Sequence, residues 1–160
     1  IPEIPILLTL LGRCSDSLKQ YFESKCATPN HTIRIHDPIE PDQIFTLDAE
    51  QDIGLALESG VSLNRNIALT NKIFTYLLAG NAVLVSETPA QKNFIQEYPS
   101  TGLSYPIGDI QSLANHLTFF YQNRQTLQHA RRSAWQLAHD TLNWEEEQKK
   151  LIKLIESIWR

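Results

Sequence analysis

The sequence lacks several features that mark particular classes of protein. It contains no methionine and only two cysteines, Cys14 and Cys26. Two cysteines are too few for a disulfide framework, and their spacing matches no common metal-binding motif, so we expect two reduced thiols in a cytosolic protein. No apolar run is long enough to cross a bilayer and no charged-then-apolar signal segment is present, so we predict a cytoplasmic location.

The chain also has fewer basic than acidic side chains. Fourteen lysines and arginines stand against 18 aspartates and glutamates, which gives a formal net charge of −4. A chain with this balance has no broad basic surface to hold a nucleic acid backbone, although local basic patches remain open. We therefore exclude nucleic acid from the expected partners.

Self-contained catalytic motifs are missing as well. The chain has no G-x-S-x-G nucleophile elbow, no P-loop and no G-x-G-x-x-G after its first apolar run. Serine hydrolases, nucleoside triphosphatases and dinucleotide-binding enzymes therefore lose their usual signals. The five histidines show no metal-ligand spacing, and we interpret them as surface or partly buried side chains. The sequence predicts no catalytic residue and no metal site within this chain.

What the sequence does contain is an alternation of strand-like and helix-like segments. Its 160 residues, 42% hydrophobic and 20% charged, are ordinary for one globular domain. We predict strands at 5–12, 32–36, 52–58, 82–86 and 102–105, a polar loop at 59–68, and closing helices at about 108–121, 125–139 and 143–159. This alternation predicts an α/β fold, a Rossmann-like parallel sheet with helices on both faces.

Residues 70–86 form the clearest part of this pattern. Thr70 is predicted to cap a helix with its side-chain oxygen, and Gly80 to end that helix in the left-handed conformation. The following run, A-V-L-V-S, is typical of a parallel strand buried on both faces. Because ligands of open parallel sheets bind outside the carboxyl ends of the strands, residues 58–72 and 86–91 are expected to line one crevice.

The start of the 70–79 helix is a candidate anion site. The free N–H groups around Asn71, Lys72 and Ile73 point toward a bound anion, and the helix dipole favours negative charge there. Lys72 either adds a positive charge to this site or is only a solvated surface lysine. Asn71 is equally explained as a second capping residue.

Two segments resemble a known family. Residues 52–58, D-I-G-L-A-L-E, and 69–86, L-T-N-K-I-F-T-Y-L-L-A-G-N-A-V-L-V-S, look like the donor-binding domain of GT-B glycosyltransferases, most similar to family 4, also called group 1. Residues 8–12, 102–113 and 143–145 resemble that domain more loosely. The resemblance implies one half of a GT-B architecture and sugar transfer from a nucleotide-diphosphate sugar, usually without a metal or other cofactor.

The resemblance also implies where the donor is held. The family's ribose-binding glutamate aligns with Thr75, and its first glutamate, with seven residues between the two, aligns with Ile67. A hydroxyl at Thr75 can make a single, weaker contact, and Glu58 is the nearby acid to which we assign the missing role. Thr88 and Gln91 are expected to border the sugar or phosphate, or to act only as a helix cap.

We therefore predict that residues 1–160 are a single domain, the truncated donor-binding half of a glycosyltransferase. The chain begins at Ile1 without a methionine, so we expect an acceptor domain with any catalytic base before it, and an inactive isolated fragment. The expected partners are a nucleotide-diphosphate sugar, that N-terminal domain and, for the full-length protein, a membrane surface.

An alternative function belongs to a different class. A domain of the same fold that has lost donor binding could bind a partner protein through the apolar stripe of its closing helix. That stripe contains Leu151, Ile155, Ile158 and Trp159. Packing of the stripe onto this domain, or onto the missing one, is the interpretation that we favour.

Overall fold

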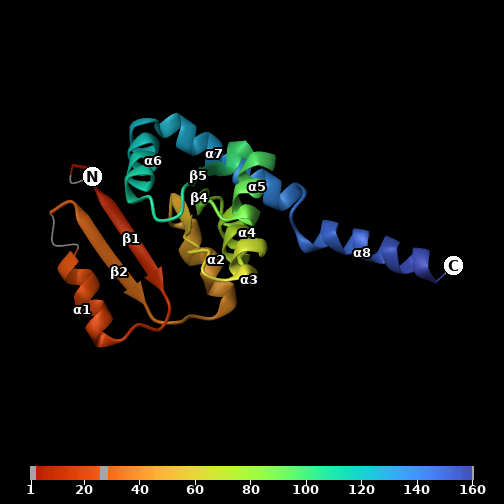
Figure 1. Ribbon diagram of the computed structural model, residues 1–160, viewed down its shortest axis with the longest axis horizontal. Helices are drawn as coiled ribbons and strands as arrows, with labels where there is room; N and C mark the ends of the chain where they lie inside the picture. The colour runs from red at the N-terminus through yellow and green to blue at the C-terminus, as the bar shows by residue number, and fades with distance from the viewer. Residues whose placement is uncertain (1–2, 26–28, 160) are drawn as a thin grey trace. The chain divides into compact units, whose positions relative to one another are not determined.

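The computed structural model describes residues 3–25 and 29–159 (Figure 1). Within them Cys14 is a free, half-buried thiol, whereas Cys26 lies outside the described residues. The chain divides into two compact units, Ile1–Ile44 and Phe45–Arg160.

The first unit contains a pair of parallel strands. β1 (Ile6–Leu11) pairs with β2 (His31–His36) in the register that sets Ile6 opposite His31. α1 (Asp16–Lys25) lies between the two strands in the sequence and packs against β2. Parallel strands need such a crossover because the chain must return to the same end of the sheet.

β1 is less buried than its apolar sequence predicts. The continuous apolar run at 5–12 indicates a buried strand, but no residue of β1 is fully buried, and Leu7 and Leu11 remain 42% and 38% exposed. The expectation of burial was wrong because β1 belongs to a two-stranded sheet. Two strands and the helix beside them provide too little chain to cover both faces of a sheet.

The second unit is built on a three-stranded parallel sheet with the order β3-β4-β5. β4 (Ala82–Ser86) is central, between β3 (Ile53–Ala56) and β5 (Gly102–Tyr105). α2 (Pro41–Ala49) precedes this sheet in the chain. The later helices are α3 (Leu63–Ile67), α4 (Asn71–Leu78), α5 (Pro89–Glu97), α6 (Ile110–Gln122), α7 (Arg124–Asp140) and α8 (Trp144–Ile158), with a 3-10 turn at Pro99–Thr101.

β4 is buried along its whole length, as its sequence predicts. Val83 and Val85 belong to a core cluster with residues of α4, α5 and α7, whereas Ala82 and Leu84 belong to a second cluster with residues of α6 and α7. Because successive side chains of a strand point to opposite faces, these two clusters are the two faces of the sheet. Helices therefore cover both faces.

The predicted fold class is confirmed. The chain is an α/β protein with parallel strands surrounded by helices, consistent with a Rossmann-like fold. The strands are hydrogen-bonded in two sheets, one in each unit, where we expected one sheet.

The predicted polar loop at 59–68 is partly helical, so this prediction was wrong. α3 occupies Leu63–Ile67 and begins at Ser62, whose Oγ accepts a hydrogen bond from the Arg65 N–H at 3.3 Å. A serine whose side chain accepts a hydrogen bond from the backbone N–H three residues later is a common start of a helix. The polar composition of the segment concealed this signal.

The two segments that resemble the transferase family contact each other. A Cβ atom added at Gly54 would lie 2.2 Å from Cγ of Tyr76, so the tyrosine ring occupies the space that any larger residue would need. The Tyr76 hydroxyl donates to the Leu55 carbonyl oxygen at 3.4 Å. Packing of α4 on β3 therefore explains both Gly54 and Tyr76 without a ligand.

Other residues of the same segments fix the end of α4. Gly80 has a φ of +76°, and its N–H bonds the Leu77 carbonyl while that of Asn81 bonds the Tyr76 carbonyl, the two bonds of a Schellman cap. Gly80 therefore ends the helix as predicted. From α7, Arg131 donates to the Gly80 carbonyl at 3.0 Å and pairs with Asp52 at 2.9 Å.

α8 does not pack onto the rest of the second unit, to which it belongs. None of its residues is buried, and Figure 1 shows it projecting beyond α7. Its predicted apolar stripe is open to solvent, with Ile158 72% and Trp159 86% exposed. We favoured packing of this stripe either onto this domain or onto the missing one. Packing onto this domain is wrong, because the turn after Asp140 directs the helix away.

Candidate functional site

The carboxyl ends of β3 and β4 are joined at Glu58 and Ser86. The Glu58 N–H donates to Ser86 Oγ at 2.8 Å, and the Ser86 hydroxyl lies 2.7 Å from the Glu58 carbonyl oxygen, to which it donates. Both residues are buried, at 3% and 2% exposure. This backbone clamp fixes Glu58 at the edge of the sheet where ligands of such folds bind.

The Glu58 side chain holds two cations, one on each carboxylate oxygen. Arg65 Nη1 donates to Oε2, and Lys72 Nζ donates to Oε1 at 3.1 Å. The Glu58 side chain is 2% exposed, whereas those of Arg65 and Lys72 are 54% and 55% exposed. A single inward-facing carboxylate is thus covered by two cations that also reach solvent.

The pairing keeps Glu58 ionised. Burial by itself raises the pKa of this carboxyl, but the hydrogen bonds and positive charges of Lys72 and Arg65 outweigh burial, and the pKa falls below its ordinary value of 4.5. At neutral pH the cluster therefore consists of one negative and two positive charges. Its net charge is positive.

The start of α4 lies beside this cluster through Lys72. Thr70 does not cap the helix as we predicted: its side chain makes no cap hydrogen bond, and its Oγ1 is buried without a partner among the described residues. The Ile73 N–H bonds the Thr70 carbonyl at 3.2 Å, which closes the first turn through the backbone. The prediction that the Thr70 hydroxyl caps α4 is therefore wrong.

The predicted site residues of α4 differ in accessibility. Asn71 and Lys72 are exposed, whereas Ile73 is fully buried in the core and its N–H bonds the Thr70 carbonyl, so the predicted free N–H of Ile73 is not available to an anion. The Thr75 hydroxyl donates to the Asn71 carbonyl at 3.1 Å, one turn back along the same helix. A ligand contact by Thr75 would have to replace this bond.

Thr88 and Gln91 form a buried helix start. Thr88 Oγ1 accepts from the Gln91 N–H at 3.4 Å, which confirms the predicted cap of α5. Gln91 Nε2 donates to Ser86 Oγ at 3.3 Å, and its Oε1 has no partner among the described residues. Both side chains are fully buried and do not reach solvent, and Gln91 supports the Glu58–Ser86 clamp through its bond to Ser86.

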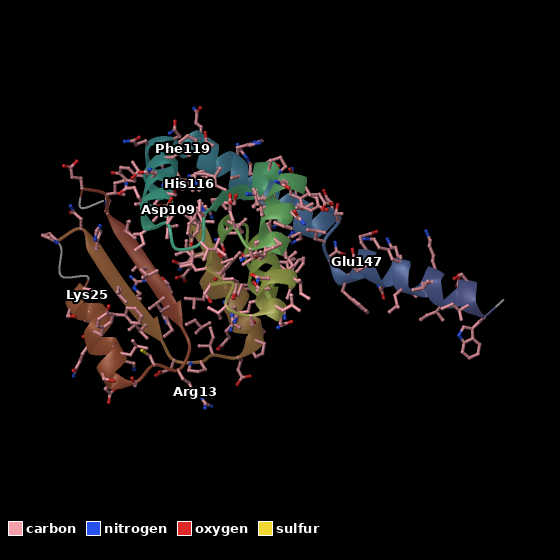
Figure 2. The ribbon with its side chains drawn as sticks, viewed as in Figure 1. Arg13, Lys25, Asp109, His116, Phe119 and Glu147 are labelled. Carbon is pink, nitrogen blue, oxygen red and sulfur yellow. The ribbon has the colours of Figure 1, made fainter. Side chains whose placement is uncertain are left out.

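A groove borders α4 at Asn71. It has a volume of about 710 Å³ and is lined by Phe74 of α4 and by residues of the α7–α8 turn and the first turn of α8. Glu147, which also lines it, is placed on the first turn of α8 in Figure 2. Of the seven residues predicted for the site, only Asn71 borders this groove, so the groove is not the predicted crevice.

Arg65 is the site residue that the sequence interpretation missed. It lies on α3, in the segment taken for a loop, and the structure brings it to Glu58 from seven positions along the chain. A signal was present in the Ser62 cap, which makes 62–67 a helical turn and directs Arg65 back toward the strand end. Because the helical turn at 62–67 was not predicted, the direction of the Arg65 side chain could not be inferred from the sequence.

Two absences among the described residues bear on the chemistry of the chain. Among residues 3–25 and 29–159, no three histidine, cysteine, aspartate or glutamate side chains gather closely enough to hold a metal ion. No helix within the same residues combines the length and the apolar character needed to span a bilayer.

Comparison with known proteins adds no relative. No protein-family model matches the chain, and a search of curated proteins finds no match.

Proposed function

We propose that this chain is the donor-binding domain of a GT-B glycosyltransferase and holds the diphosphate of a nucleotide-sugar at the carboxyl edge of the β3-β4-β5 sheet. The observation that carries the proposal is the meeting of Arg65 and Lys72 at the strand end marked by Glu58, beside the start of α4. Two accessible cations and the positive end of a helix dipole suit a diphosphate.

In this proposal the domain contributes binding and orientation. The Arg65 and Lys72 side chains would neutralise charge on the diphosphate as the sugar–phosphate bond breaks, and so stabilise the leaving group. No group of the chain is assigned as a catalytic base, which would come from an acceptor domain outside these residues. Transfer at the resulting interdomain site would depend on positioning.

The structure also limits how a nucleoside could be held. Glu58 was assigned the role of the family's ribose-binding glutamate, but both of its oxygens are occupied by cations. We therefore place Glu58 at the phosphate end of the donor and leave the ribose to two polar side chains of α4, the exposed Asn71 and the half-buried Thr75 one turn later.

The test is a calorimetric titration of the 160-residue chain with UDP, GDP and their sugars. We expect saturable binding of at least one nucleotide, and loss of that binding in Lys72→Ala. Lys149→Ala is the matched control, because Lys149 is an equally exposed lysine that pairs with Glu146 on α8. Absence of heat with every nucleotide, or equal loss in both variants, would contradict the proposal.

A second function is favoured by one observation, the exposed apolar stripe of α8. The four residues Leu151, Ile155, Ile158 and Trp159 are all between 47% and 86% exposed, and their spacing places them on one apolar face of the helix. A non-catalytic domain that binds a partner through this stripe is therefore the alternative proposal. Binding of a partner that is lost when the stripe is made polar, together with no response to any nucleotide, would favour it.

A further inference from the structure

We propose that Glu58 is a built-in competitor for the anionic ligand of this site: its carboxylate weakens the binding of anions to the Arg65–Lys72 pair, and weakens it most for a ligand with the charge of a diphosphate. This inference rests on the proposed function and adds an affinity-determining residue to it. The steps of the argument are the geometry of the ion pairs, the cost of breaking them and the charge of the ligand that could do so.

The geometry makes Glu58 a stand-in for a phosphate group. Its two oxygens each receive one cation, Lys72 on Oε1 and Arg65 on Oε2, in the manner of two donors on neighbouring oxygens of a phosphate. Both cations are more than half exposed, so a ligand from solvent can approach them. The carboxylate itself is not accessible, at 2% side-chain exposure.

The burial of Glu58 sets a threshold for ligand binding. A ligand that drew both cations away would leave a buried, unpaired carboxylate, which is costly. The backbone clamp to Ser86 prevents Glu58 from turning out to solvent with its strand end. The ligand must therefore bridge the two cations while they stay close to Glu58. In that position the negatively charged ligand is repelled by the Glu58 carboxylate.

This repulsion weighs most on ligands of high negative charge. The free cluster has a net charge of +1, from two cations and one carboxylate. A diphosphate places several charges against both cations and the N–H groups that open α4, and the carboxylate repels each of those charges, so the loss of binding energy grows with the charge of the ligand. Glu58 thus lowers the affinity for polyphosphates more than the affinity for singly charged anions.

The experiment measures binding of inorganic pyrophosphate and of orthophosphate to the 160-residue chain and to Glu58→Gln. Removing the carboxylate charge should tighten pyrophosphate binding by about tenfold or more, the size of one charge–charge term at contact distance in a partly solvated site. Orthophosphate, which carries less charge, should gain less than pyrophosphate, so that the ratio of pyrophosphate to orthophosphate affinity rises. Arg65→Gln and Lys72→Gln should weaken both.

The matched control is Glu146→Gln. Glu146 lies on α8 and pairs with Lys149 at 2.5 Å, and it contacts neither Arg65 nor Lys72 in the described structure. Its substitution changes the net charge by the same amount and should leave pyrophosphate affinity unchanged. Equal tightening in Glu146→Gln, or no tightening in Glu58→Gln, would overturn the inference.

A measurement on the unsubstituted chain covers the case in which Glu58→Gln does not fold. Pyrophosphate should shift the NMR signals of the Arg65 guanidinium, the Lys72 ammonium and the Glu58 carboxylate together. Binding that leaves these signals in place, or no binding, would overturn the inference. Nucleotides that bind no tighter than pyrophosphate would contradict the proposed function alone, because competition by Glu58 does not depend on a nucleoside.

Discussion

At the scale of single residues, most of the family-like positions have structural explanations. Gly54 makes room for the Tyr76 ring, and Gly80 forms the left-handed cap of α4. The Asn81 amide donates to the carbonyl oxygens of Asp48 and Gln51, at 2.9 and 2.6 Å. These residues would be needed for the fold whether or not the chain binds a donor. Among the family-like positions that the structure describes, Glu58 with its two cations and the start of α4 are left to offer groups to a ligand.

Gly54→Ala should destabilise the second unit. The added methyl group would lie 2.2 Å from Tyr76 Cγ, so the aromatic ring or the strand must shift. Such overpacking costs typically about 1–3 kcal/mol in the free energy of unfolding, which chemical denaturation can measure. The double variant Gly54→Ala/Tyr76→Ala should show a smaller additional cost of the glycine change. An alanine at position 54 that leaves the unfolding free energy unchanged would refute this packing.

The stability contributed by Glu58 should depend on pH. Its pKa in the folded chain is below 4.5, so the ionised carboxylate contributes stability that is fully present above that value and is lost as the pH falls through the folded-state pKa. At neutral pH, Glu58→Gln should lower the unfolding free energy by roughly 1–2 kcal/mol, a modest amount because both cations are exposed. The difference between the two proteins should narrow in acid. A difference that stays constant with pH would contradict the ion pairs.

At the scale of elements, α8 differs from the rest of the second unit. Asn143 begins it as predicted, with Oδ1 accepting from the Glu146 N–H at 2.9 Å, and two ion pairs join neighbouring turns along its surface, Lys149 to Glu146 and Lys150 to Glu147. These local interactions support a helix without tertiary packing. Its apolar stripe is therefore a surface rather than part of the core.

Removal of residues 144–160 should change the thermal stability of the remaining chain very little. No residue of α8 is buried, so its loss exposes no core. Differential scanning calorimetry of the shortened and complete chains measures this directly. A large drop in the melting temperature would mean that the stripe packs against the domain in solution.

At the scale of the whole molecule, the sequence predicted the order and type of most elements. The helix–glycine–strand segment at 70–86 was predictable, apart from its Thr70 cap, because a left-handed glycine and a short apolar run act locally. The exposure of β1 was not, because burial depends on which strands and helices are brought together. The role of Glu58 was also beyond the sequence, since its partner Arg65 lies on a short helix within a segment that reads as a polar loop.

The proposed donor site is tested most directly by NMR titration of the 160-residue chain with a nucleoside diphosphate. If the site is as proposed, amide signals of residues 58–59 and 71–73 will shift in a saturable way, while those of α8 stay in place. Saturable shifts confined to other residues, or no shifts at concentrations where the chain stays folded, would contradict a donor site at the ends of β3 and β4.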